Sequence, residues 1–212
     1  MAEALPVSRP AYWEEAAAEL AQADPGMAEL VARYAGLGLG SRGDPFSTLA
    51  RSIVGQQISV KAADAVWARL LGAVERIVPE AVLAVDAQTL SASGLSRRKV
   101  EYLTDLADHF VRGRLQPERW AARGDTEIIA ELTAVRGIGR WTAEMFLIFN
   151  LMRPDVFPLD DIGLQRAICL RYFGGERQSP KVLSGFGERW RPWRTVATWY
   201  LWRSLDPVPV EY

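Results

Sequence analysis

The chain has a single cysteine, Cys169, and a single histidine, His109, among its 212 residues. One cysteine excludes a disulfide within the chain, a four-cysteine iron–sulfur cluster and a structural zinc site of the CxxC type. One histidine excludes a histidine-rich metal site and argues against a Ser-His-Asp triad. We therefore expect the chemistry of this protein to rest on other side chains.

Neither sign of charge is in excess, since 25 lysines and arginines face 26 aspartates and glutamates. This balance excludes a strongly basic, histone-like nucleic-acid binder but allows a local basic face. The longest apolar run, residues 145–149, is too short to span a membrane, and residues 1–6 contain no basic segment followed by an apolar one. We expect a reduced, cytoplasmic protein without a secretory signal and without a membrane partner.

Alternating, valine-rich segments typical of strands are also absent, and nearly every long segment has a helical period. Hydrophobic residues make up 49% and charged residues 24% of the chain, as in an ordinary globular protein with a real core. The sequence predicts an all-α protein with short loops. The expected helices include residues 12–23, 27–34, 46–57, 97–111, 126–135, 140–151 and 160–173.

The most informative segment is LTAVRGIGRWTA, residues 132–143, which predicts two helices joined by a tight glycine turn. Gly137 and Gly139 permit positive φ and carry no side chain, so the amides of the turn and of the next helix are free to point outward. Such amides, together with the helix dipole, bind phosphate without any net positive charge. The alternative is a plain helix-turn-helix corner in which the glycines only allow close packing, and the turn alone favours neither interpretation.

An aspartate pair, Asp160 and Asp161, follows Pro158 and predicts the start of another helix. We expect the first aspartate to be the N-cap and the second to lie in the first turn, facing a cleft. Taken alone, the pair is explained more simply by stabilisation of the helix start through its dipole.

Together, the hairpin and the segment DVFPLDD at 155–161 resemble the helix-hairpin-helix, Gly/Pro…Asp superfamily of DNA glycosylases. Three further segments are similar to its 3-methyladenine DNA glycosylase II, or AlkA-type, branch: GQQIS at 55–59, GLS at 94–96 and WRPWR at 190–194. The β-rich N-terminal domain of larger members is missing, since residues 1–43 are expected to be helical. The resemblance, which covers most of residues 44–206, therefore indicates a short-form member.

The resemblance implies an all-α fold of two helical subdomains with the active-site cleft between them. We expect residues 45–159 to form the helix-hairpin-helix subdomain, and residues 1–44 and 160–212 to pack together as the other. It also implies excision of alkylated, 3-methyladenine-like bases from damaged double-stranded DNA, as the first step of base excision repair. We expect a monomer of bacterial type that associates with the nucleoid.

The family's essential aspartate corresponds to Asp161. Lyase-competent relatives place a catalytic lysine where this chain has Trp141, and tryptophan cannot form a Schiff base, so the resemblance implies a monofunctional glycosylase. The expected base pocket consists of Trp141, Met145, Trp202 and Ile162, because electron-rich rings attract cationic bases. The alternative for the tryptophans is core packing, which we expect for Trp13, Trp67 and Trp120.

For DNA contacts, the resemblance points to Gly137, Gly139 and Thr142 at the hairpin. It matches Gln57 to the side chain that fills the duplex after base flipping. The alternative is that Gln56 and Gln57 only cap neighbouring helices. No cofactor is required, although relatives hold a monovalent cation on hairpin carbonyls that correspond to Thr133, Val135 and Ile138.

Two other functions stay open at this point. A non-enzymatic helix-hairpin-helix DNA-binding module would explain the glycine turn but neither Asp161 nor the aromatic final helix. A glycosylase for a different lesion, such as a deaminated, oxidised or etheno base, would explain all of these residues, because the shape of the pocket decides the substrate.

Overall fold

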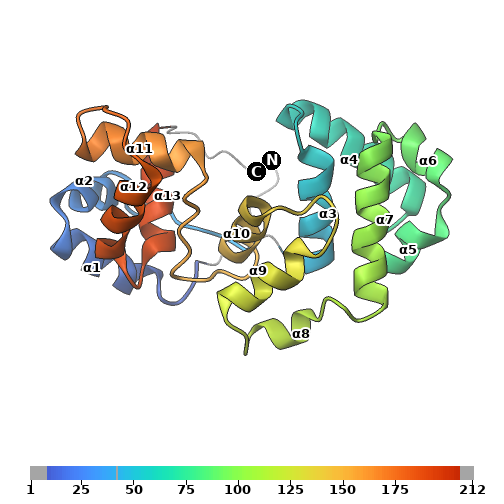
Figure 1. Cartoon of the computed structure of the whole chain (residues 1–212), viewed down its shortest axis with the longest axis horizontal. Helices are drawn as coiled ribbons and strands as arrows, with labels where there is room; N and C mark the ends of the chain where they lie inside the picture. Colours follow the sequence, from blue (N-terminus) through green and yellow to red (C-terminus); the bar gives the residue numbers. More distant parts are fainter. Residues whose placement is uncertain (1–8, 42, 206–212) are drawn as a thin grey trace. The chain divides into compact units, whose positions relative to one another are not determined.

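The computed structural model describes residues 9–41 and 43–205, and within these ranges the chain contains helices and no strand. The predicted all-α fold is confirmed (Figure 1). The elements are α1 (Trp13–Ala23), α2 (Pro25–Arg33), α3 (Pro45–Gly55), α4 (Val60–Val74), α5 (Pro79–Ala84), α6 (Ala87–Ala92), α7 (Arg97–Val111), α8 (Pro117–Trp120), α9 (Asp125–Thr133), α10 (Arg140–Phe149), α11 (Ile162–Tyr172), α12 (Pro180–Gly187), the 3-10 helix η1 (Glu188–Trp190) and α13 (Arg194–Leu205).

The described residues form two compact units, one made of 9–41 with 147–205 and the other of 43–146. The sequence predicted borders after residues 44 and 159, whereas the structure places them after 41 and 146. The second border comes earlier and lies inside α10, because Phe149 in the last turn of α10 stacks on Trp202 of α13. The segment after α10 is also hydrogen-bonded to α13, for example through Thr195 N–H and the Pro154 carbonyl at 3.0 Å. That segment therefore belongs with the C-terminal helices.

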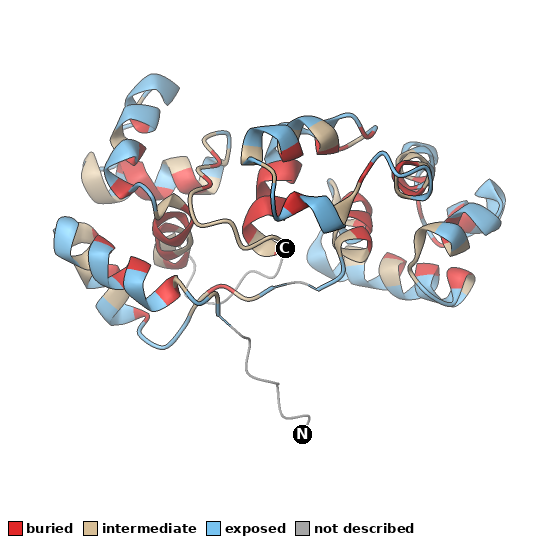
Figure 2. Cartoon of the chain, turned by 90° about the horizontal axis from the view of Figure 1, so that it is seen from below, coloured by how far each residue is buried: buried red, intermediate tan, exposed pale blue. Residues whose placement is uncertain are grey.

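In the unit of residues 43–146, α7 packs against α3 and α5 (Figure 1). Its apolar residues recur at helical spacing, so one face of α7 buries Val100, Leu103 and Leu106. Asp44 begins α3 as an N-cap, accepting the amide of Ser47 at 2.7 Å. Figure 2 shows the same pattern in most helices, with buried residues along one side and exposed residues along the other.

In the unit of residues 9–41 and 147–205, α1 packs on α2, and α13 packs on both of them and on α11. The buried carboxylate of Asp24 links α2 to η1, because it caps α2 and accepts a hydrogen bond from Trp190 Nε1 at 3.0 Å. Trp13 and Trp120 are buried in the two cores, as predicted, whereas Trp67 is only half-buried and lies under the Arg51 guanidinium. None of the described helices is both long and apolar enough to cross a membrane.

Candidate active site and DNA-contacting hairpin

The predicted hairpin is formed by α9, a turn and α10. The turn is closed by two short-range hydrogen bonds, from Val135 N–H to the Leu132 carbonyl at 3.1 Å and from Ile138 N–H to the Val135 carbonyl at 3.2 Å. Gly137 has φ +82°, as expected. Both glycines permit positive φ, but Gly139 does not lie in the left-handed region, so only Gly137 uses that freedom.

The two glycines serve different purposes. A Cβ on Gly137 would lie 2.2 Å from Tyr102 Cδ2, so this position needs glycine both for its φ and for the close approach of α7. Among the described residues other than its chain neighbours, a Cβ on Gly139 would meet no atom within 4 Å, and Gly139 is exposed. Glycine at 139 is thus dispensable for packing but leaves the surface open at the beginning of α10, where backbone amides are available to a phosphate.

Two side chains outside the hairpin hold its turn. Gln56 Nε2 donates to the Gly137 carbonyl at 2.8 Å, and Asp105 accepts the Arg136 amide at 2.9 Å. The sequence analysis missed Asp105, because a carboxylate on the polar side of α7 carries no signal of a contact 31 residues away. Gln56 is the C-cap residue of α3, in line with the capping alternative, and its side chain in addition reaches the hairpin turn.

Gln57 lies at the turn that follows α3, and its side chain is exposed. Its φ is +59°, a conformation that non-glycine residues rarely adopt and that often marks functional positions. Lys99 Nζ donates to the Val54 carbonyl at 2.7 Å, so this carbonyl in the last turn of α3 has a hydrogen-bond partner. Gln56 and Gln57 therefore differ, since only Gln57 is presented to solvent.

The first turns of α10 carry three predicted site residues. Trp141 is 37% exposed, whereas Met145, one turn later, and Thr142 are buried. Because Thr142 is buried, only its backbone N–H in the first turn of the helix is left for the DNA contact that the sequence predicts, and this contact stays a prediction.

Asp161 is the N-cap of α11, and its Oδ1 accepts the Leu164 amide at 2.6 Å. The expectation that Asp160 caps the helix while Asp161 lies in its first turn is wrong by one residue. Asp160 is exposed and precedes the cap. The reason is the preceding turn, in which Asp161 N–H bonds to the Pro158 carbonyl at 3.0 Å and so delays the helix by one residue.

Trp202, on α13, donates from Nε1 to Asp161 Oδ1 at 2.8 Å. Its ring stacks on Phe149 of α10 with a centroid distance of 5.9 Å and an interplanar angle of 10°. Phe149 was missed by the sequence analysis, because a phenylalanine at the end of an apolar helix looks like core. One unit thus brings together Asp161, Trp202 and Phe149.

Two neighbours complete the surroundings of Asp161. Ile162 is 79% exposed, so this apolar side chain is presented beside the carboxylate rather than packed into the core. A Cβ on Gly163 would lie 3.1 Å from Asp161 Oδ1 and 3.6 Å from Trp202 Nε1. Gly163, also missed, leaves the space in which the aspartate and the indole meet.

The remaining predicted residues, Trp141 and Met145, belong to the other unit, and the predicted cleft between the two subdomains stays a prediction. Within the described residues, no group of three or more histidine, cysteine, aspartate or glutamate side chains is arranged to hold a metal ion. The unit of residues 9–41 and 147–205 supplies one carboxylate beside a stacked pair of aromatic rings.

Comparison with known proteins yields relatives along most of the chain. Residues 50–192 match the family described as HhH-GPD superfamily base excision DNA repair protein. DNA-3-methyladenine glycosylase 1 of Schizosaccharomyces pombe is 34% identical over 170 residues, which cover 76% of this chain and 72% of that protein.

Two solved structures have the same fold. The DNA-3-methyladenine glycosidase of Bacillus halodurans superposes with a TM-score of 0.77 at 36% identity, covering 86% of this chain and 90% of that one. The Schizosaccharomyces pombe 3-methyladenine DNA glycosylase Mag1, solved in complex with abasic DNA, superposes with a TM-score of 0.77 at 29% identity, covering 92% and 100%. With the glycine hairpin and the aspartate at the start of α11, these matches establish that the chain belongs to the HhH-GPD superfamily of base excision DNA repair proteins.

Proposed function

We propose that this protein is a DNA glycosylase that removes alkylated, positively charged bases such as 3-methyladenine from double-stranded DNA. The observation that carries the proposal is the arrangement of Asp161. Its Oδ1 is held by Trp202 Nε1 at 2.8 Å and by the Leu164 amide at 2.6 Å, next to the stacked pair of Trp202 and Phe149. The names of the relatives support the same activity.

The reaction needs little from the protein beyond one anion and a place for the base. The target nucleotide leaves the stack and enters a pocket. Electron-rich rings favour a cationic base over a neutral one. Trp202, stacked on Phe149 and hydrogen-bonded to Asp161, supplies such a ring.

An N-alkylated purine is already a good leaving group. When the bond between the base and C1′ breaks, the base takes the electron pair and departs neutral, while positive charge develops on the sugar. The Asp161 carboxylate stabilises this charge. Water then adds its oxygen to C1′ and loses one proton, to Asp161 and from there to solvent, which leaves an abasic site.

The hairpin supplies the attachment to DNA. The amides at the start of α10, next to the open Gly139, bind a backbone phosphate, which positions the protein without reading sequence. Gln57, exposed in its left-handed turn, fills the space that the flipped nucleotide leaves. One chain contains both the hairpin and Asp161, so we propose that it acts as a monomer.

We also propose that no cofactor takes part in the chemistry. A monovalent cation at the hairpin would be held by the carbonyls of Thr133, Val135 and Ile138, and would add positive charge beside the bound phosphate. The Val135 carbonyl accepts the Ile138 amide at 3.2 Å, and a carbonyl oxygen has a second lone pair for an ion.

The test of the proposed activity is release of free bases from duplexes that carry one defined lesion each. We expect release of 3-methyladenine and other N-alkylated, cationic purines, and much slower release of etheno and deaminated bases, because only the cationic bases leave without protonation. Preferred release of a neutral lesion would assign the protein to a different substrate. Tight binding of all these duplexes without any release would indicate a non-enzymatic DNA-binding module.

The product should be an intact abasic site, because Trp141 occupies the position at which lyase-competent relatives carry lysine. We expect strand breaks only after alkali or heat, and no protein–DNA adduct on treatment with borohydride. Lys99 is the lysine to control for, since burial lowers the pKa of its amine, which favours a nucleophile. Its Nζ is bonded to the Val54 carbonyl, so Lys99→Met should leave the product unchanged. Efficient trapping with the unaltered protein would refute the monofunctional mechanism.

A further inference from the structure

One threonine at the beginning of α13 forms hydrogen bonds to the segment that joins α10 to α11. Thr195 Oγ1 donates to the Arg153 carbonyl at 2.6 Å and accepts the Val156 amide at 2.9 Å. The Thr195 amide itself donates to the Pro154 carbonyl at 3.0 Å. Thr195 is fully buried, and its one hydroxyl satisfies both a buried donor, the Val156 amide, and a part-buried acceptor, the Arg153 carbonyl.

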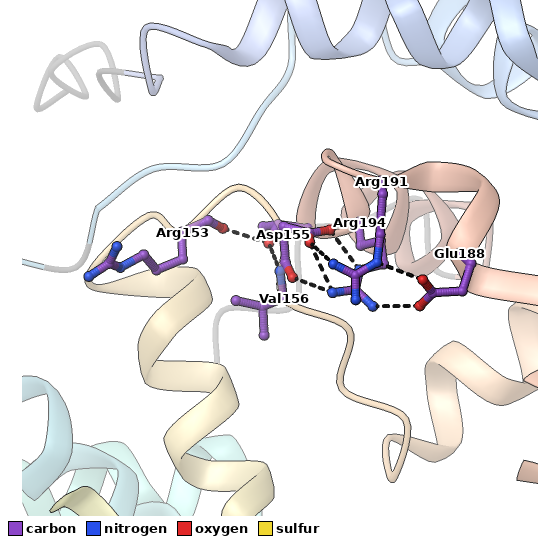
Figure 3. A network of polar contacts seen from close by, with 7 residues as sticks. Arg153, Asp155, Val156, Glu188, Arg191 and Arg194 are labelled. Atoms are coloured by element: carbon purple, nitrogen blue, oxygen red, sulfur yellow. Dashed lines mark hydrogen bonds and ion pairs between the residues drawn. The ribbon is translucent and has the colours of Figure 1, made fainter. Parts of the chain in front are cut away.

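An ion-pair cluster reinforces the same attachment (Figure 3). Arg194 donates two hydrogen bonds to the Asp155 carboxylate, from Nε to Oδ1 at 2.6 Å and from Nη2 to Oδ2 at 3.0 Å. Nη2 also donates to the Asp155 carbonyl at 3.0 Å. Arg191 contacts Asp155 Oδ2 at 2.8 Å, and Glu188 pairs with both arginines. This fork-like geometry has more directional specificity than a single contact.

The other end of the segment is hydrogen-bonded to the same helix. Trp202 follows Thr195 by seven residues, which places both on one face of α13. Trp202 Nε1 bonds to Asp161 Oδ1 at 2.8 Å, and α11, which Asp161 caps, packs on α13. The segment 153–161 is therefore attached at both ends to a single face of one helix.

We propose that Thr195, supported by the Arg194–Asp155 pair, is a positioning residue that sets where the segment meets α13 and thereby where the Asp161 carboxylate is held. Its effect on the reaction rests on the proposed glycosylase function; its effect on the geometry does not. Replacing the hydroxyl with a methyl group removes the acceptor of the buried Val156 amide and the Thr195 bond to the Arg153 carbonyl. The segment then shifts to find other partners, and the shift reaches Asp161 and its bond to Trp202.

The first measurement is independent of activity. Thr195→Val removes the hydroxyl at nearly constant volume, and Thr195→Ser retains it. The matched control is Tyr172→Phe, which removes a hydroxyl that bonds to Asp24 at the opposite end of α11. In ¹H–¹⁵N spectra, the Trp202 indole resonance, assigned with Trp202→Phe, should shift and exchange faster in Thr195→Val, while Thr195→Ser and Tyr172→Phe leave it unchanged.

The second measurement is single-turnover base release with saturating enzyme, at a temperature well below the Tm of every variant. Thr195→Val should release the base about 10- to 100-fold more slowly at unchanged DNA affinity, as expected when a catalytic group is misplaced by about 1 Å. Thr195→Ser should restore the rate, and Tyr172→Phe should not lower it. Asp155→Asn, which weakens the grip of Arg194 at a partly exposed site, should act in the same direction with a smaller effect and serves where Thr195→Val does not fold.

If Thr195→Val folds and its Trp202 indole resonance is unchanged, the proposal is overturned. If Thr195→Val does not fold, an unchanged resonance in Asp155→Asn would overturn the proposal. So would an equal loss of rate in Tyr172→Phe at an equal loss of Tm, because the effect would then be general destabilisation. If the resonance shifts but the unaltered protein releases no alkylated base, the positioning role stands and the proposed glycosylase function fails.

Discussion

Replacing Asp161 with asparagine should lower the single-turnover rate of base release about 1,000-fold, the upper range for loss of one preorganised electrostatic contact. The change removes the negative charge that stabilises the sugar cation. It retains an oxygen that can accept both the Leu164 amide and Trp202 Nε1. Asparagine is also as good an N-cap as aspartate, so α11 should begin unchanged and the free energy of unfolding should stay within about 0.5 kcal/mol.

The matched control is Asp160→Asn, which removes a neighbouring charge from an exposed residue outside the cap. We expect its rate to stay within about threefold of the original, because Asp160 neither caps α11 nor bonds to Trp202. DNA affinity should be nearly unchanged in both variants, since a carboxylate does not attract phosphate. If Asp160→Asn were the inactive variant, Asp160 and not Asp161 would be the functional aspartate. If neither lost activity, the carboxylate mechanism would be refuted.

Replacing Gly137 with alanine should destabilise the protein by about 3 kcal/mol or more, because two costs add. An L-residue in the left-handed region costs about 1–2 kcal/mol. A Cβ at this position lies 2.2 Å from the Tyr102 ring, so α7 or the hairpin must move, which costs about 1–3 kcal/mol more. We expect a fall in Tm of about 10 °C and weaker binding to all DNA, damaged or not.

Gly139→Ala separates packing from DNA contact. Beyond the chain neighbours, no atom in the described part of the chain lies within 4 Å of the added Cβ, so stability should change by less than about 0.5 kcal/mol. The methyl group occupies the space through which a phosphate approaches the α10 amides, so affinity should fall about tenfold, or 1.4 kcal/mol, for damaged and undamaged duplexes alike. Thermal melts and binding titrations at fixed salt measure both effects. Unchanged DNA binding by Gly139→Ala would show that the hairpin does not contact the phosphate backbone of DNA.

The sequence by itself was enough to predict the fold class and the helical hairpin. Helical periodicity, capping residues and glycine turns are local signals, and they predicted most helices with small errors at their ends. The hairpin glycines and the aspartate pair were visible for the same reason, since each depends on neighbours in sequence. Local signals did not suffice even at Asp161, where the turn at Pro158 moved the N-cap by one residue.

Only the tertiary structure decided how distant residues hold these local features in place. Gln56 and Asp105 reach the hairpin across 81 and 31 residues, and Trp202 reaches Asp161 across 41. Such contacts depend on how helices pack, and no pattern in the sequence between the two partners of a contact predicts them. The border between the compact units moved for the same reason. Thr195 and Arg194 bind the segment after α10 through buried hydrogen bonds and an ion pair, which are properties of the folded chain and not of any stretch of its sequence.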